Sequence, residues 1–276
     1  MIFAVLGGDG RAARLCRLLC ADGHTVRAFA LERALPECVP DADAAVGGAD
    51  CVILPLPCEA DGALFAPLSA LRPPLPGLLE RTVPGTRIFA GKAPEPLRAE
   101  CRRRGLPLTD FLHREDFALR NAELTAEGAM ALLLQGEGAL RDSRVLIVGF
   151  GRIGRFLAEK LRNLGADVTV AARRPEDRAL AKLMRCRAAA IGAAAVPAQW
   201  DAVVNTVPAQ ILGTAELDAF GDARLLELAS PPYGFDLAAA AALGKRVEVH
   251  GGLPGKYAPA AAAAALRDTI YSVLED

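Results

Sequence analysis

The amino-acid sequence predicts an α/β protein built from two Rossmann-like, doubly wound domains. Two segments, one starting at Ile2 and one at Val145, each run through a strand, a glycine-rich turn and a helix. The second segment carries the full Gly-X-Gly-X-X-Gly spacing that opens a dinucleotide-binding βαβ unit. The length of 276 residues suits two domains of ordinary size.

The first segment begins with an apolar run, Ile2–Leu6, which predicts a strand. Gly7 and Gly8 break it, and the leucine spacing over Arg11–Ala21 predicts a helix that ends before Gly23. Proline-rich Leu71–Pro84 is expected to be loop. The remaining expected elements are strands at His24–Leu31, Cys51–Leu56, Arg87–Ala90 and Leu106–Leu108, and a helix at Pro96–Arg104.

The second segment shows a clearer pattern of strand, turn and helix than the first. Val145–Val148 predicts a strand, Gly149–Gly154 a turn, and Arg155–Leu164 a helix that Gly165 caps. Further strands are expected at Val168–Ala172, Asp201–Asn205, Leu225–Leu228 and Val247–His250.

Two helices connect these segments. One is expected at Asn121–Gln135 and one at Pro259–Leu274. We expect the last helix to return to the first domain, which then comprises residues 1–118 and 259–276, with residues 119–258 forming the NADP-binding domain. The active site is expected in the cleft between the domains.

Composition excludes several function classes. The net charge of −1 gives no basic field for nucleic acid, and no apolar run reaches the roughly 18–20 residues that span a bilayer. The start of the chain does not resemble a signal peptide. The seven cysteines form no metal-ligand pattern, so we expect no metal site. We interpret them as reduced cysteines, which indicates a cytoplasmic protein. We also expect the protein to be a homo-oligomer. The basic run Arg102–Arg104 is interpreted as a solvated helix end.

The glycines of the second segment have separate roles. Gly149 allows the tight turn, Gly151 lets a pyrophosphate approach the backbone, and Gly154 lets the helix pack on the strand. The helix then presents free N–H groups to the phosphates. The predicted cofactor-binding residues are Gly149, Gly151, Arg152, Ile153, Gly154, Arg173, Arg174, Asn205, Thr206, Pro208 and Ser230.

The end of the next strand indicates which dinucleotide is bound. NAD-selective domains usually carry Asp or Glu there, whereas this sequence has Arg173 and Arg174. Guanidinium groups suit a 2′-phosphate, so the sequence favours NADP, with NAD possible. The alternative is that both arginines are exposed loop charges.

The first segment lacks the full glycine spacing. It reads Gly7-Gly8-Asp9-Gly10-Arg11, and Asp9 would repel a phosphate. We therefore expect a degenerate domain without nucleotide, in which Asp9 and Arg11 can instead line the cleft.

Three loops after strands are expected at the ligand-binding edge of the second domain. Asn205–Pro208 can contact the nicotinamide ribose, or simply end a strand. Ser230 can bond nicotinamide or substrate, and Pro231 fixes its loop. The backbone of Gly251–Gly255 can bind a carboxylate.

Substrate and catalytic candidates follow from charge and position. The expected substrate-binding residues are Asn121, Thr125, Ser230, Pro231, Leu253, Pro254 and Lys256, with Lys92 as a second lysine. Asn121 and Thr125 can alternatively cap the helix they open. Glu123, on one helical face with Glu127, and His250 are the candidate catalytic bases, and His113 is a further possibility. A lone histidine or lysine is also commonly structural.

The combination of motifs resembles one family. The segments are the opening GGDGR, the glycine loop, RNAELTAEG from Arg120, NTVP from Asn205, LASPPYGFD from Leu228 and GLPGKYAP from Gly252. Together, and in this order, they resemble the A subunits of bacterial dipicolinate synthases.

The resemblance implies an NAD(P)-linked oxidation of a cyclic dicarboxylate of the lysine branch, hydroxy-tetrahydrodipicolinate or dihydrodipicolinate, to dipicolinate during sporulation. It also implies that the partner is a flavoprotein-like B subunit. Two alternatives stay open: a non-catalytic NADP-binding protein that supports such a partner, and a 2-hydroxy-acid or amino-acid dehydrogenase of similar architecture.

Overall fold

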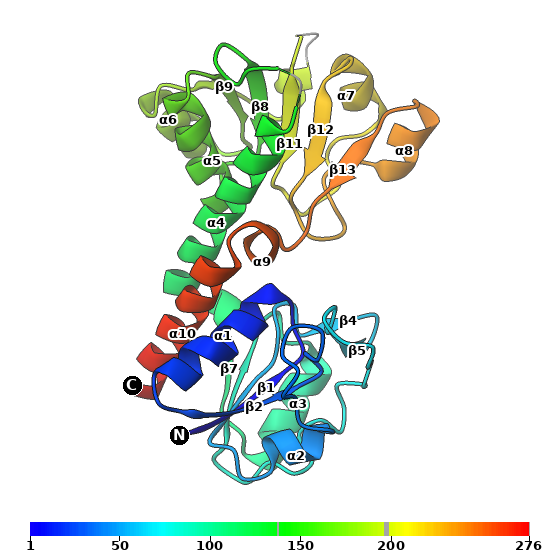
Figure 1. Cartoon of the computed structure of the whole chain (residues 1–276). Coiled ribbons are helices and arrows are strands. Elements are labelled where there is room, and N and C mark those ends of the chain that lie inside the picture. Colours follow the sequence, from blue (N-terminus) through cyan, green and yellow to red (C-terminus); the bar gives the residue numbers. More distant parts are fainter. Residues whose placement is uncertain (137, 196–198, 276) are drawn as a thin grey trace. The chain divides into compact units, whose positions relative to one another are not determined.

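The computed structural model describes residues 1–136, 138–195 and 199–275. The chain divides into two compact units. The first comprises Met1–Asn121 and Pro254–Asp276, and the second comprises Ala122–Leu253 (Figure 1). Each unit is a parallel sheet with helices on both faces, so the predicted α/β class is confirmed.

The first unit has a five-stranded parallel sheet in the order β2-β1-β3-β6-β7. This 2-1-3-4-5 order is one of the two common doubly wound arrangements. The strands are β1 (Ile2–Leu6), β2 (Thr25–Phe29), β3 (Cys51–Ile53), β6 (Arg87–Ala90) and β7 (Leu108–Asp110). A separate hairpin pairs β4 (Glu59–Ala60) with β5 (Ala63–Leu64).

Alternating side chains of β1 explain the two layers of helices. Phe3 and Val5 join a core with α1 (Gly10–Ala21), and Ala4 and Leu6 join one with α2 (Ala42–Val46) and α3 (Glu95–Arg104). A strand buried on both faces needs apolar residues at every position, which is the pattern that the sequence shows.

The last helix, α10 (Pro259–Glu275), belongs to the first unit and confirms the predicted return of the chain. Its Ala263, Leu266 and Ile270 share a buried cluster with Leu15 and Leu19 of α1. The alanine-rich face lets the two helices approach closely.

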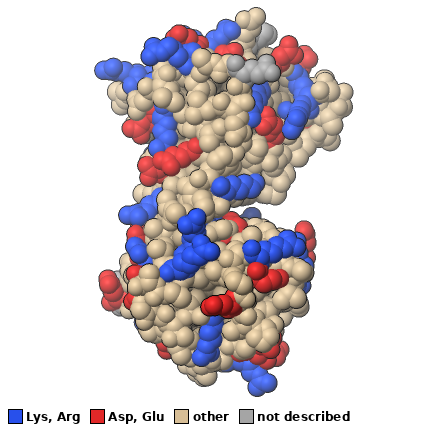
Figure 2. Space-filling model, in the orientation of Figure 1, with Lys and Arg blue, Asp and Glu red and all other residues tan. Residues whose placement is uncertain are grey.

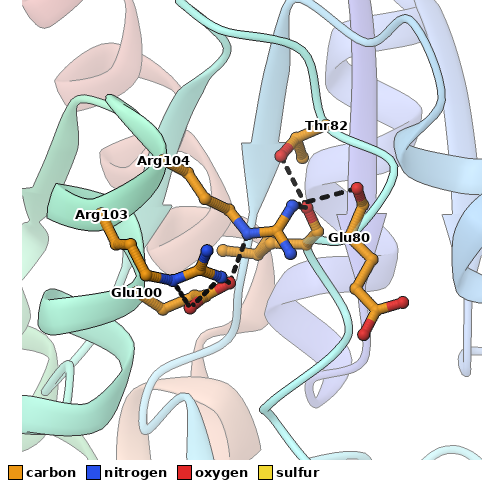
Figure 3. A network of polar contacts seen from close by, with 6 residues as sticks. Glu80, Thr82, Glu100, Arg103 and Arg104 are labelled. Atoms are coloured by element: carbon orange, nitrogen blue, oxygen red, sulfur yellow. Dashed lines mark hydrogen bonds and ion pairs between the residues drawn. The ribbon is translucent and has the colours of Figure 1, made fainter.

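The basic run at the end of α3 has a structural role. Arg103 and Arg104 both pair with Glu100, and Arg104 also donates to the carbonyls of Leu79 and Glu80 at 3.2 and 3.0 Å (Figure 3). Leu79 and Glu80 belong to the proline-rich segment Leu71–Pro84, which is loop, as predicted. Arg104 therefore fastens that loop to the helix.

The second unit has a six-stranded parallel sheet in the order β10-β9-β8-β11-β12-β13. This 3-2-1-4-5-6 order is that of dinucleotide-binding domains. The strands are β8 (Arg144–Val148), β9 (Asp167–Ala171), β10 (Arg187–Ala189), β11 (Ala202–Asn205), β12 (Arg224–Glu227) and β13 (Val247–Val249).

Helices cover both faces of this sheet. Val145 and Ile147 pack in a core with α4 (Glu115–Leu134), α5 (Arg152–Asn163) and α6 (Pro175–Leu183), and Leu146 and Val148 pack in one with α7 (Thr214–Ala219) and α8 (Leu237–Ala242). Gly165, with φ of +88°, follows α5 as the predicted cap. The short helix α9 (Leu253–Tyr257) follows β13.

Several predicted boundaries were wrong: the helix expected from Arg155 begins at Arg152, and the strand expected at Cys51–Leu56 ends at Ile53. The helix expected from Asn121 begins at Glu115, because the chain leaves a 3₁₀ turn at Phe111–His113 and acidic Glu115 and Asp116 suit a helix N-terminus. The strand expected at Leu106–Leu108 lies at Leu108–Asp110, since Ile88 pairs with Leu108.

Charged side chains of both signs are interspersed over the visible face (Figure 2). Among the described residues, no helix is long and apolar enough to cross a membrane.

Candidate functional site

The glycine loop after β8 has the geometry that its sequence predicts. Gly149 has φ of +98°, and a Cβ there would lie 2.5 Å from Oγ1 of Thr206. A Cβ at Gly154 would lie 2.3 Å from the carbonyl oxygen of Gly149. Any side chain at these two positions would therefore displace its neighbours, which explains both glycines.

Gly151 differs from its two neighbours. It is the N-cap of α5, and a Cβ there would meet no described atom within 4 Å. Packing within the protein does not require glycine here, but close approach by a ligand would. The space lies at a helix N-terminus, where free N–H groups favour phosphate. Beside it, Arg152 is exposed and Ile153 packs partly against the core, so this loop fits a dinucleotide pyrophosphate.

A chain of polar contacts joins this loop to the end of β9. Arg155 donates to the carbonyl of Phe150 at 3.0 Å and to Asp177 at 3.0 Å. Asp177, a buried residue, also accepts from Arg174 at 2.8 Å. These hydrogen bonds, from Arg174 first and then Arg155, hold the pKa of Asp177 below its usual range.

Arg173 and Arg174 thus have different surroundings. Arg174 is held by Asp177, whereas Arg173 is exposed and its carbonyl accepts from Arg178 at 2.7 Å. Sequence reasoning missed Arg155 and Asp177. The spacing of three residues between Arg174 and Asp177 at a helix start was the available signal.

The strands β8, β11 and β12 are neighbours, so the loops that follow them lie at one edge of the sheet. Thr206 donates its hydroxyl to the carbonyl of Val148 at 3.0 Å, which places it beside the glycine loop. The next loops carry Pro208, Ser230 and Pro231, all of which are exposed. The predicted cofactor residues of these three loops are therefore brought together.

Asn205 itself is fully buried. Its amide contacts the carboxylate of Glu227 at 2.7 Å and the backbone of Val207. The buried side chain therefore organises the loop, and contact between this segment and a cofactor stays a prediction for its backbone and for Thr206. Sequence reasoning also missed Glu227, whose only signal was a carboxylate within an apolar strand.

The predicted residues of α4 lie inside the helix. Asn121 and Thr125 are in its interior, so the interpretation that they cap it is wrong, because the helix starts at Glu115. Glu123 and Glu127 do share one face, where both approach Nζ of Lys160 on α5, at 3.8 and 3.3 Å. Thr125 is buried and Glu123 is exposed.

His250 follows the edge strand β13. Its backbone N–H donates to the carbonyl of Glu227 at 2.9 Å, and its Nε2 lies 3.3 Å from Glu248. Glu248 also accepts two hydrogen bonds from Arg224, at 2.7 and 2.9 Å. The hydrogen bonds from Arg224 are the largest cause of a lowered pKa at Glu248, and the contact with His250 adds to them. Together they lower this pKa to about 2.

The predicted loop Gly251–Gly255 is shorter than expected. Only Gly251 and Gly252 precede the helix α9, because Pro254 is well suited to a first helical turn. Leu253 is 1% exposed in the core of the second unit, so its side chain packs there. In the first unit, Pro254 is buried and Lys256 is exposed.

The glycine-rich loop of the first unit is occupied by its own side chains. Asp9 caps α1 and accepts from the backbone and guanidinium of Arg11, at 3.0 and 2.8 Å. Arg11 is buried and also donates to the carbonyl of Leu56. Lys92, at the end of β6, is exposed with φ of +57°.

A hollow of about 1180 Å³ lies at the opposite edge of the second sheet. Its lining includes Arg144 and Arg224, the first residues of β8 and β12, and Trp200 and Asp201, which precede β11. Its described lining contains none of the predicted site residues. The hollow and the glycine loop are therefore separate features.

Comparison with known proteins adds two family models. Residues 2–112 match the N-terminal domain of the dipicolinate synthase A subunits. Residues 113–225 match the NAD-binding domain of D-isomer specific 2-hydroxyacid dehydrogenases. The second match confirms the prediction of an NAD(P)-binding domain and indicates an oxidoreductase.

Individual relatives agree with these models. The dipicolinate synthase A subunit of Bacillus subtilis (strain 168) is 30% identical over 213 residues, covering 72% of this chain and 68% of the relative. The crystal structure of the same enzyme's A subunit from Bacillus subtilis has a TM-score of 0.82 at 26% identity, covering 100% of this chain and 96% of that one.

Two further solved structures share the fold. The dipicolinate synthase A subunit from Bacillus halodurans has a TM-score of 0.86 at 24% identity, over 100% of this chain and 98% of that one. D-lactate dehydrogenase from Escherichia coli has a TM-score of 0.64 at 13% identity, over 100% and 97%.

Proposed function

Because the chain belongs to the family of dipicolinate synthase A subunits, we propose that it oxidises a cyclic dicarboxylate of the lysine branch to dipicolinate with NAD(P)⁺. The observation that carries the proposal is the open space at Gly151 beside two glycines that packing requires. This space indicates a loop that can bind a dinucleotide. The loop lies at the carboxyl edge of the second sheet, the same edge as Thr206 and Ser230.

The reaction divides into two parts. Hydroxy-tetrahydrodipicolinate loses water to give the dihydro compound, which then loses a hydride and a proton as the ring becomes aromatic. The nicotinamide supplies the hydride acceptor. The protein has to hold the ring carbon toward it and accept the proton.

Candidate residues for these tasks lie in each unit. Ser230, Pro231, Leu253 and Thr125 are the substrate candidates of the second unit, and Asn121, Pro254 and Lys256 are those of the first. Lys256 is exposed and supplies the positive charge that a dicarboxylate requires. Glu123 and His250 are the candidate bases.

We prefer NADP over NAD for the cofactor. Arg173 is exposed next to the end of β9, and Asp177 holds Arg174 in place beside it. Two guanidiniums there suit a 2′-phosphate, and no carboxylate follows the strand at the position that binds a free ribose hydroxyl. The proposed partner is a flavoprotein-like B subunit, and the proposed setting is the cytoplasm of a sporulating cell.

The test is a reconstituted reaction. The chain is mixed with NADP⁺ and freshly made lysine-branch intermediate, with and without the B subunit of the same source. The proposal predicts that NADPH and dipicolinate absorbance rise together, in equal amounts. If the complete mixture forms neither product, the proposed reaction is wrong.

A second candidate is a non-catalytic NADP-binding protein that supports the partner. It is favoured by the contacts of the two candidate bases, because Glu123 pairs with Lys160 and Nε2 of His250 lies 3.3 Å from Glu248. Hydride transfer by the purified chain alone would exclude this candidate.

A further inference from the structure

Glu227 is a fully buried carboxylate at the last position of β12. Its Oε1 accepts hydrogen bonds from the side-chain amide of Asn205 at 2.7 Å and from the backbone N–H of Ala229 at 2.8 Å. Its Oε2 accepts from the N–H groups of Gly234 at 2.8 Å and Phe235 at 3.2 Å. All four of these partners are neutral N–H donors. Burial of a carboxylate is costly unless such donors satisfy it.

These contacts join two loops at the carboxyl edge of the second sheet. Ala229, Gly234 and Phe235 flank the turn that carries Ser230 and Pro231. Asn205 extends the network to the other loop, because it both donates to the carbonyl of Val207 at 3.0 Å and accepts from its N–H at 3.1 Å. Glu227 therefore connects the loop of Thr206 to the loop of Ser230, beyond the pairing of their strands.

The packing around this network leaves little freedom. A Cβ at Gly234 would lie 2.2 Å from Nδ2 of Asn205. Tyr233, just before it, has φ of +65°, an uncommon conformation for a residue with a side chain. Such backbone persists only where surrounding contacts hold it, and the N–H groups that follow Tyr233 are the ones bound by Glu227.

We propose that Glu227 is a positioning residue for the nicotinamide half of the dinucleotide. None of its four hydrogen bonds involves the glycine loop, whose geometry rests on Gly149, Gly154 and Arg155. The hydrogen bonds of Glu227 are thus distinct from those that shape the glycine loop, which the loop of Asn205 touches through Thr206. The inference rests on the proposed function only as far as cofactor binding, and not on the identity of the substrate.

The test separates the two halves of the cofactor. In Glu227→Gln, an NH₂ group replaces one oxygen and faces N–H donors, so the loops lose their spacing. We measure the dissociation constants of NADP⁺ and of 2′-phospho-ADP-ribose, which lacks nicotinamide. We expect NADP⁺ to bind about tenfold more weakly, the equivalent of about 1.4 kcal/mol. Binding of 2′-phospho-ADP-ribose should change less than about twofold.

Asp201→Asn is the matched control. Asp201 also accepts a backbone N–H, that of Arg144 at 2.6 Å, but at the opposite edge of the same sheet. Both ligands should bind this control as they bind the unaltered chain. Asn205→Ala is a milder variant that keeps three of the four bonds to Glu227, and serves if Glu227→Gln does not fold. It should weaken NADP⁺ selectively as well.

Three outcomes would overturn the inference. Equal weakening of both ligands would show that Glu227 only holds the domain together. Unchanged NADP⁺ binding in both variants would show that the two loops do not position nicotinamide. If the unaltered chain binds neither ligand, cofactor binding itself is wrong, and the inference falls with it. If both ligands bind but no dipicolinate forms, the proposed reaction fails and the positioning role stands.

Discussion

The carboxylate of Asp9 lies against the backbone of Gly255, so close that a Cβ at position 255 would sit 2.2 Å from Oδ2 of Asp9. Both residues belong to the first unit, and they come from two motifs far apart in the sequence, GGDGR and GLPGK. The contact explains why the second motif carries a glycine inside the helix α9. Asp9 in turn is held by the buried Arg11.

Gly255→Ala should therefore destabilise the protein. Alanine ordinarily favours a helix over glycine, but here it must displace a carboxylate, and overpacking costs about 1–3 kcal/mol. Urea unfolding measures the loss. The matched control is Gly251→Ala, because a Cβ at Gly251 would meet no described atom within 4 Å. Equal stability of the two variants would refute the contact.

Arg173→Ala should reduce the preference for NADPH over NADH. Arg173 is exposed near the proposed 2′-phosphate, and a charge-assisted hydrogen bond supports a loss of about tenfold in the ratio of the two affinities. Fluorescence titration with each cofactor gives the ratio. A useful comparison is Asp177→Asn, which removes the carboxylate that holds Arg174. Equal affinity for both cofactors in the unaltered chain and in Arg173→Ala would rule out the preference.

The stability contributed by Glu248 should depend on pH. Its folded pKa is about 2 against an ordinary 4.5, so the contribution is present in full above pH 4.5 and is lost as pH falls toward 2. At neutral pH the shift sets an upper bound of about 3 kcal/mol, and solvent screening at this partly exposed pair lowers the contribution toward about 1 kcal/mol. Glu248→Gln should therefore be less stable than the unaltered chain at neutral pH, and the difference should shrink as pH falls from 4.5 to about 2. A difference in unfolding free energy that stays constant over that range would contradict the role of Arg224.

The sequence was most informative at the strand Val145–Val148 and the glycine-rich turn that follows it. The strand Val145–Val148 alternates between two cores, and each position is apolar, so its burial on both faces was readable. The positions of Gly149 and Gly154 follow from steric contact with Thr206 and with the chain's own backbone. Such local requirements are visible in one sequence.

Other features depend on contacts that a single sequence does not display. The start of α4 at Glu115 was missed because a 3₁₀ turn leads into it. Glu227 lies among leucines, and its role depends on Asn205 and on loop N–H groups 7 and 8 residues away. The helix α8 was not predicted, because its alanine-rich sequence shows no apolar periodicity. The available signal was Asp236, which caps the helix by accepting from the N–H groups of Ala238 and Ala239.

The most direct test of the account is NADP⁺ binding by Gly151→Ala. The central claim is that the second unit binds NAD(P) at the loop in which Gly151 is the glycine that packing does not require. Gly154→Ala is the comparison, since it must disturb the loop itself. We predict that Gly151→Ala stays folded, with a loss of about 1 kcal/mol from the poorer N-cap, and binds NADP⁺ at least about tenfold more weakly, because a methyl group meets the pyrophosphate. Unchanged affinity for NADP⁺ in a folded Gly151→Ala variant would contradict the claim.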